Sequence, residues 1–102
     1  ESDMNRPDIC IGTDTYHTST VLKNQLSTAF KAHGYDVAID SPFSGTIVPL
    51  KHYHKDQRVE SVMIEVNRSL YASPSGFKRV QSDLSHAISQ AATIGPYNNP
   101  GE

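Results

Sequence analysis

Glu65 is a single carboxylate in the middle of an apolar run, and this setting makes it the leading candidate for a residue with a chemical role. The run 61–68 alternates β-branched residues with Met63, Glu65 and Asn67, which predicts a strand that is apolar on one face and nearly apolar on the other. Strands of this kind lie in the middle of parallel sheets, where a carboxylate loses its hydration. That loss costs several kcal/mol unless a cation, a hydrogen-bond donor or a metal compensates. We therefore expect Glu65 to be buried and to have a specific partner.

Two interpretations of Glu65 remain open from the residues alone. In the functional interpretation it belongs to a ligand site, because Asp14, Asp40 and Arg68 also fall at or near the ends of predicted strands. Ligands of open parallel sheets bind beyond the carboxyl ends of the strands. In the structural interpretation, Glu65 forms an ion pair with Arg68 or Arg58.

His52 and His54 form a weaker candidate site. They stand two residues apart, so on an extended segment both would face one side, with Asp56 in the same register. Imidazole pairs of this kind bind zinc, and the alternative is a polar loop without a metal. The other histidines, His17 among them, have less to offer.

Three strands, two helices and one long loop are expected to position these residues. Residues 41–60 lack a regular pattern, and loops of this length are usually functional or disordered. The order of the elements predicts an α/β fold with a mainly parallel three-stranded sheet and two or more helices. The patterns place strands at 8–14, 36–40 and 61–68, one helix from Ser19 to Gly34, a second from Ser73 to Gly95, and a frayed tail at 97–102.

Composition narrows the class of protein. A chain of 102 residues is long enough for one domain with a single core. Nine lysines and arginines against eleven aspartates and glutamates, without a basic run, argue against nucleic acid or an anionic membrane as a partner. The lone Cys10, between two isoleucines, is typical of a small buried hydrophobe in a reducing compartment, so we expect a cytoplasmic protein. No apolar run reaches the roughly 20 residues of a membrane span.

Residues 40–47 carry an aromatic residue after a proline and then a glycine, and residues 63–71 contain Glu-x-Asn-Arg-x-x-Tyr. These two segments resemble the C-terminal half of the N-formylglutamate amidohydrolase family. The predicted strand, helix and strand before the first segment and the helix after the second fit the same half, so the resemblance spans residues 8–92. Asp40 stands where the family has asparagine, and Thr46 stands where it has a second glycine.

The resemblance implies a zinc hydrolase with a carboxypeptidase-like α/β/α sandwich that cleaves N-formyl-L-glutamate to formate and glutamate, or a related N-acyl amino acid. Glu65 would be the general base that takes a proton from the attacking water. Arg68 could pair with a substrate carboxylate through its planar fork. The loop with Ser44 and Gly45 would wall the pocket, and Tyr71 would either hydrogen-bond the substrate or pack under the last helix.

Nothing in the chain matches the His-Ser-Gly and later His-Ser metal-binding motifs of that family. The resemblance therefore implies that residues 1–102 are a C-terminal fragment, inactive alone, whose zinc ligands lie in an N-terminal half. Its expected partners are that half, a small acyl-amino-acid substrate and, through exposed sheet surface, a second copy. The alternative from a different class is a non-catalytic α/β binding or scaffold module that lacks the metal-binding half.

Overall fold

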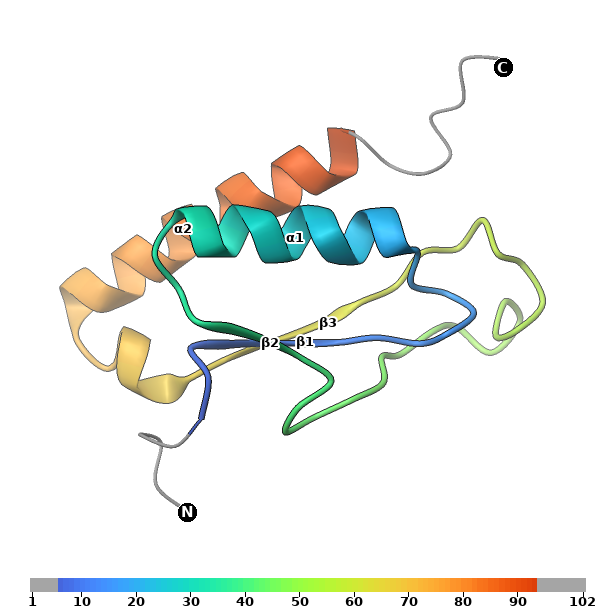
Figure 1. The fold of residues 1–102 in the computed structure, drawn as a ribbon, viewed down its shortest axis with the longest axis horizontal. Coiled ribbons are helices and arrows are strands. Elements are labelled where there is room, and N and C mark those ends of the chain that lie inside the picture. The colour runs from blue at the N-terminus through green and yellow to red at the C-terminus, as the bar shows by residue number, and fades with distance from the viewer. Residues whose placement is uncertain (1–5, 94–102) are drawn as a thin grey trace.

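Two helices lie on one face of a three-stranded sheet in the computed structural model, which describes residues 6–93 (Figure 1). The expected small α/β fold is confirmed. The long connection between the second and third strands passes beyond one end of the sheet. The expected tail at 97–102 lies outside the described residues. The elements are β1 (Ile9–Gly12), α1 (Thr20–Ala32), β2 (Val37–Ile39), β3 (Met63–Val66), the 3-10 helix η2 (Arg68–Tyr71) and α2 (Pro74–Thr93).

The sheet is mixed rather than mainly parallel. Its strands lie in the order β2-β1-β3. Strand β1 pairs with β2 in parallel, with Ile9 opposite Val37, and with β3 in the antiparallel direction, with Cys10 opposite Glu65. The crossover through α1 makes the first pair parallel. The connection from β2 to β3 re-enters the sheet at the end it left, so β3 runs the opposite way and the expectation of a mainly parallel sheet is wrong.

The direction of β3 separates residues that were expected to converge. Asp14 and Asp40 follow the C-terminal ends of β1 and β2, which lie at one end of the sheet. Arg68 follows the C-terminal end of β3 at the opposite end, where the Asn67 N–H donates to the Asp8 carbonyl over 2.9 Å. The expected meeting of these three side chains at one sheet edge is therefore wrong.

Helix α1 begins and ends at the residues that the sequence indicates. The Ser19 hydroxyl accepts a hydrogen bond from the Leu22 N–H over 3.0 Å and caps the first turn. Gly34 follows the last turn at a φ of +93°, and its N–H donates to the Lys31 carbonyl over 2.9 Å. On the buried side of the helix, the side chain of Phe30 has no exposed surface. The predicted helix from Ser19 to Gly34 is confirmed.

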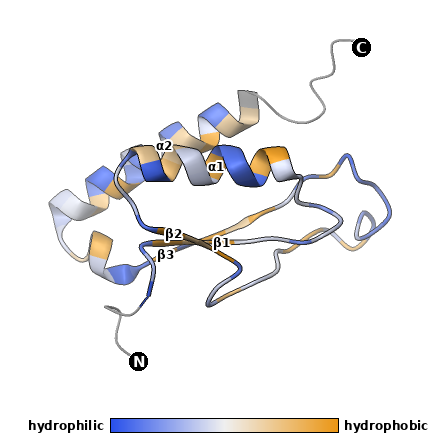
Figure 2. Cartoon of the chain, viewed as in Figure 1, coloured by the Kyte–Doolittle hydropathy of each residue, from blue (hydrophilic) through white to orange (hydrophobic). Residues whose placement is uncertain are grey.

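The core lies between the two helices and the helix-facing side of the sheet (Figure 2). Tyr35 closes one end of it, and its hydroxyl donates to Asp83 over 2.6 Å. Burial and this hydrogen bond raise the pKa of Tyr35 to about 12. The buried members of the core are Ile9, Ile11, Leu26, Ala29, Phe30, Tyr35, Val80, Ala87 and Ala91.

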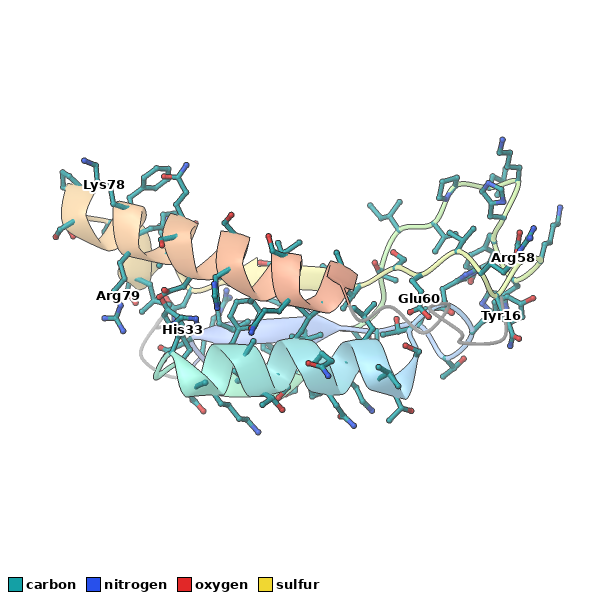
Figure 3. All side chains as sticks on the ribbon, turned by 90° about the horizontal axis from the view of Figure 1, so that it is seen from above. Tyr16, His33, Arg58, Glu60, Lys78 and Arg79 are labelled. Carbon is teal, nitrogen blue, oxygen red and sulfur yellow. The ribbon has the colours of Figure 1, made fainter. Side chains whose placement is uncertain are left out.

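The two helices pack on different elements. Helix α1 packs on β1 and β2, whereas α2 packs mainly against α1 and η2 and lies over β3 (Figure 3). The loops that carry Tyr16 and Arg58 extend beyond the sheet at one end of the molecule. In the described part of the chain, neither helix combines the length and the apolar character that a bilayer span requires.

Candidate functional site

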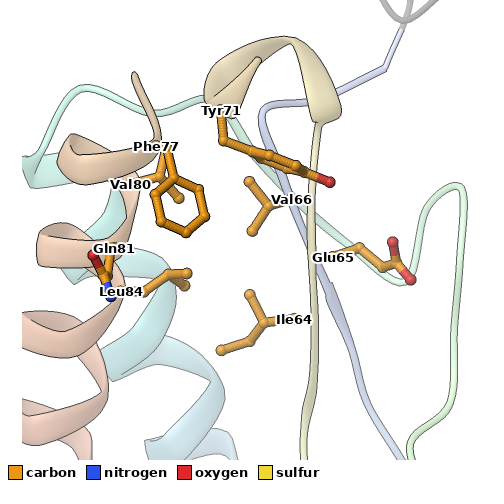
Figure 4. Close-up of a pocket in the computed structure, with 8 residues that line it drawn as sticks. All are labelled: Ile64, Glu65, Val66, Tyr71, Phe77, Val80, Gln81 and Leu84. Carbon is orange, nitrogen blue, oxygen red and sulfur yellow. The ribbon is translucent and has the colours of Figure 1, made fainter. Parts of the chain in front are cut away.

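The side chain of Glu65 lies on the face of the sheet that carries no helix. Ile64 and Val66 point toward α2, and Glu65 points the opposite way (Figure 4). The carboxylate is exposed, because β3 is an edge strand and both helices cover the other face. The expectation of a buried, dehydrated Glu65 is therefore wrong, and the carboxylate is open to ligands.

The ion-pair interpretation of Glu65 finds no support among residues 6–93. Arg58 pairs instead with Asp56, with Nε and Nη2 at 2.9 and 3.0 Å from the two carboxylate oxygens. These hydrogen bonds from Arg58 lower the pKa of Asp56 to about 2. Glu65 forms no ion pair within the described residues. The ion pair between Arg58 and Asp56 lies in the loop before β3.

The loop 40–45 crosses the open face and is fastened to the end of β1. Asp40, in the left-handed region at a φ of 57°, accepts hydrogen bonds from the backbone N–H and the hydroxyl of Thr13, both over 2.7 Å. The Gly45 N–H donates to the Thr13 carbonyl over 3.2 Å. A Cβ at Gly12 would meet the Gly45 carbonyl at 2.5 Å, so this approach requires glycine. Asp40 thus anchors the loop at the end of β1.

Glu65 and this loop form a small pocket. The Cys10 thiol donates to the Phe43 carbonyl over 3.3 Å, and the Arg6 guanidinium lies over the Phe43 ring at 5.4 Å. The pocket holds about 20 Å³, which is room for about one water molecule. It is lined by Arg6, Pro7, Cys10, Pro42, Phe43, Glu65, Val66 and Asn67. Glu65 is the carboxylate that borders this pocket.

The remaining residues of the resemblance lie in η2, after the end of β3. The Asn67 side chain caps this helix by accepting the Ser69 N–H over 3.0 Å. Arg68 is exposed on its first turn. Tyr71 is 38% exposed and lines a groove between β3 and α2, together with Phe77 (Figure 4). Tyr71 thus lies where η2 meets α2.

The structure thus divides the expected site residues into two groups. Ser44 and Gly45 belong to the loop on the open face, and Gly45 is bound at the C-terminal end of β1. Arg68 and Tyr71 belong to η2 at the opposite end of the sheet. Glu65 lies between the two groups, in the register opposite Cys10 at the middle of β1.

His17, a residue with little functional signal in the sequence, is the one fully buried polar side chain of the described residues. Its Nδ1 lies 2.8 Å from the Val59 carbonyl, which only accepts, so Nδ1 carries the proton. Its Nε2 accepts the His54 N–H over 2.8 Å. His17 therefore ties the loop after β1 to residues 54–59. The sequence around His17 gives no signal for these two distant backbone partners.

Asp14 completes this junction. Its Oδ1 accepts the N–H groups of Tyr16 and His17 over 2.8 and 3.0 Å, and its Oδ2 lies 3.3 Å from His54 Nε2. Burial acts to raise the pKa of Asp14, but the hydrogen bonds from Tyr16, His17 and His54 outweigh it and lower that pKa. The His54 ring also stacks on Tyr16, with centroids 4.9 Å apart.

The expected side-by-side arrangement of His52 and His54 is wrong. Residues 51–55 form turns rather than an extended segment, and His54 has a φ of 54°. Among residues 6–93, no three or more His, Cys, Asp or Glu side chains are close enough together to hold a metal ion. The described residues alone therefore do not fit the zinc site that the resemblance implies.

Replacing His17 by alanine should destabilise the fold through this junction. The Val59 carbonyl and the His54 N–H lose their partner, which should cost about 2 to 4 kcal/mol of unfolding free energy. Urea denaturation measures the loss. The matched control is His52→Ala, in the loop that His17 contacts, because the His52 side chain forms no hydrogen bond of this kind within residues 6–93. A change of under about 0.5 kcal/mol for His17→Ala would contradict the structural role.

Comparison with known proteins assigns the chain to a family. A family model described as N-formylglutamate amidohydrolase matches residues 1–72, a range that includes Glu65, Arg68, Tyr71 and the loop 40–45 but not α2. Neither a curated protein nor a solved structure matches the chain. The matched range is more than half of the 102 residues. This chain therefore belongs to the N-formylglutamate amidohydrolase family.

Proposed function

We propose that the chain is the C-terminal part of a zinc-dependent amidohydrolase that cleaves N-formyl-L-glutamate, or a related N-acyl amino acid. Membership of the family supports an amidohydrolase-like activity. The observation that carries the proposal is the placement of Glu65, which is exposed, forms no ion pair within residues 6–93 and borders a pocket for one water molecule.

Glu65 acts as the general base of this reaction. Its carboxylate accepts a proton from the water that attacks the formyl carbon, and proton acceptance of this kind contributes about 10² to 10⁴ in rate. The water oxygen forms the new C–O bond while the carbonyl electron pair moves to oxygen. Collapse of this intermediate breaks the C–N bond, and the proton passes to the leaving nitrogen. The products are formate and glutamate when the substrate is N-formyl-L-glutamate.

Arg68 and the loop 40–45 bind the substrate in this proposal. The exposed Arg68 guanidinium offers two parallel N–H groups to a substrate carboxylate, the geometry in which arginine binds such groups best. Ser44 is exposed on the loop, and Gly45 has a φ of +85° with no atom within 4 Å of an added Cβ, so the backbone there is open to a ligand.

The zinc ion is assigned to ligands outside residues 6–93. A catalytic zinc has three protein ligands, and the described residues hold no such group. We assign these ligands to an N-terminal half of the same protein, which makes that half the partner of this chain.

Hydrolysis and metal content test this proposal together. The protein that carries this chain should release formate from N-formyl-L-glutamate, measured with a coupled formate dehydrogenase, and should contain zinc by elemental analysis. The isolated chain of residues 1–102 should retain little or no zinc after dialysis and should show no turnover. A protein that holds no zinc and shows no turnover would support the non-catalytic module instead, and a zinc-loaded protein that hydrolyses no N-acyl amino acid would contradict the proposed activity. Stoichiometric zinc in the isolated chain would contradict the assignment of the ligands elsewhere.

A further inference from the structure

The pocket beside Glu65 has a cation in its wall. Arg6 lines this pocket together with Glu65, Phe43 and the amide side chain of Asn67. Glu65 points away from α2, so the pocket lies on the face of the sheet that carries no helix (Figure 4). A cation attracts an anionic ligand most strongly where the surrounding protein keeps bulk water away. The wall therefore presents a base and a cation to the same small space.

Arg6 is held in place by Phe43. Its guanidinium lies over the Phe43 ring, 5.4 Å from the ring centroid. The residue is half-buried, and its Nε is enclosed. Contact with an aromatic ring uses the face of a guanidinium, whereas the N–H groups lie in its plane and point outward from its edge. Arg6 is thus able to rest on Phe43 and to donate to an anion, and a side chain held in advance loses less entropy on binding.

A second arginine lies at the same end of the sheet. The Asn67 N–H donates to the Asp8 carbonyl over 2.9 Å, so the segment before β1 lies beside the start of η2. Arg68 is the first residue of η2, is exposed and does not line the pocket beside Glu65. Arg6 therefore lies at the pocket and Arg68 outside it. Two guanidinium groups in this order suit a ligand with two carboxylates.

We propose that Arg6 binds the substrate carboxylate next to the scissile amide, and that Arg68 binds a second, more distant carboxylate. In an N-acyl amino acid the α-carboxylate is attached to the carbon that carries the amide nitrogen, so the cation beside the base receives it. The substrate class is then a dicarboxylic N-acyl amino acid, and Arg6 is a specificity-determining residue. This inference rests on the proposed function for the position of the scissile amide.

A purely structural role for Arg6 predicts a different result. In that role Arg6 only holds Phe43, and its loss weakens the binding of every ligand alike because the loop 40–45 is displaced. In the proposed role its loss weakens only the ligands that have an α-carboxylate. Ligands that differ in this group alone therefore separate the two roles.

Calorimetric titration with three ligands tests the proposal. They are N-formyl-L-glutamate, N-formyl-L-glutamine, which lacks the distant carboxylate, and N-formyl-L-isoglutamine, which lacks the α-carboxylate. The protein that carries this chain is used with Glu65→Gln in every sample, so that the ligands are not consumed. This protein should bind N-formyl-L-glutamate at least about tenfold more tightly than either amide, because a hydrogen-bonded arginine–carboxylate pair is lost with each.

Variants of the two arginines should change the binding of different ligands. Arg6→Met should weaken binding of N-formyl-L-glutamate and N-formyl-L-glutamine at least about tenfold and leave that of N-formyl-L-isoglutamine within about twofold. Arg68→Met should instead spare N-formyl-L-glutamine. Arg6→Lys should restore part of the lost affinity, because it keeps the charge without the planar fork. Lys31→Met, which removes an exposed cation of α1 outside the pocket, should change none of the three affinities.

The results that would overturn this inference differ from those that would overturn the proposed function. Unchanged binding of N-formyl-L-glutamate by Arg6→Met, or equal weakening of all three ligands, would overturn the role of Arg6. No binding of any of the three by the Glu65→Gln protein would overturn that role together with the proposed substrate. The expected binding pattern, with no turnover by the parent protein, would support the role of Arg6 and contradict the proposed hydrolysis alone.

Discussion

Glu65→Gln should reduce the turnover of N-formyl-L-glutamate by about 10² to 10⁴ while leaving the fold intact. Glutamine keeps the size of the side chain but accepts no proton from the attacking water. Because Glu65 is exposed and forms no ion pair within residues 6–93, its replacement breaks no ion pair of the described chain. The free energy of unfolding should change by less than about 0.5 kcal/mol, as is usual for exposed positions. Steady-state kinetics and urea denaturation on the same variant measure both quantities.

Asp36→Asn is the matched control for this variant. Asp36 is an exposed carboxylate at the start of β2, outside the Glu65 pocket, so its replacement should leave turnover unchanged. Suppose that Glu65→Gln lowers the free energy of unfolding by several kcal/mol but keeps its rate per folded molecule. That result would show that Glu65 has a structural role and not a catalytic one. That outcome would also contradict its exposure in the structure.

The largest effect on stability should come from Phe30→Ala. The Phe30 ring has no exposed surface and lies between α1 and the sheet, with its centroid 6.4 Å from that of Tyr35. Loss of a buried phenylalanine costs about 3 to 5 kcal/mol, from lost transfer free energy and the cavity left behind. Since domains of this size have only about 5 to 15 kcal/mol in total, the variant should be unfolded to a measurable extent at 37 °C. Urea denaturation followed by far-ultraviolet circular dichroism gives the change.

Val21→Ala provides the comparison for Phe30→Ala. Val21 is on the same helix but is 46% exposed, so the change should stay within about 1 kcal/mol. Equal destabilisation by the two variants would mean that the core does not lie between α1 and the sheet.

Local patterns in the sequence were sufficient to predict the elements. Ser19 and Gly34 carry the capping chemistry that begins and ends α1, and the structure uses both. The strand, helix and strand from β1 to β2 form a parallel pair, as a crossover through a helix requires. These features depend on residues close together in the chain, which is why the pattern alone identifies them.

The direction of β3 depends on the path of residues 41–60, and the exposure of Glu65 depends on which faces of the sheet are covered. Residues 41–60 have no periodic pattern, so nothing in them indicates that the chain returns to the sheet at the end it left. An apolar run such as that around Glu65 is typical of a strand covered on both faces, but the described helices cover only one. The number of layers is a property of the whole fold, and the alternation within one strand does not reveal it.

The position of His17 illustrates the same limit for the candidate site. Its partners, the Val59 carbonyl and the His54 N–H, are backbone groups of a segment about 40 residues away. Backbone groups have no residue-type signature, so a sequence pattern does not predict them. The resemblance located Glu65, Arg68 and Tyr71, because these side chains belong to a motif within one short segment.

Chemical rescue of Glu65→Ala tests most directly whether this carboxylate is the proton acceptor of the amidohydrolase. Glutamate release from N-formyl-L-glutamate is measured with increasing acetate in the buffer, at constant pH and ionic strength. If Glu65 takes the proton, the variant should be at least about 10²-fold slower than the parent protein, and acetate entering the vacated space should restore part of the rate in proportion to its concentration. Turnover by Glu65→Ala within about threefold of the parent protein, insensitive to acetate, would contradict the account.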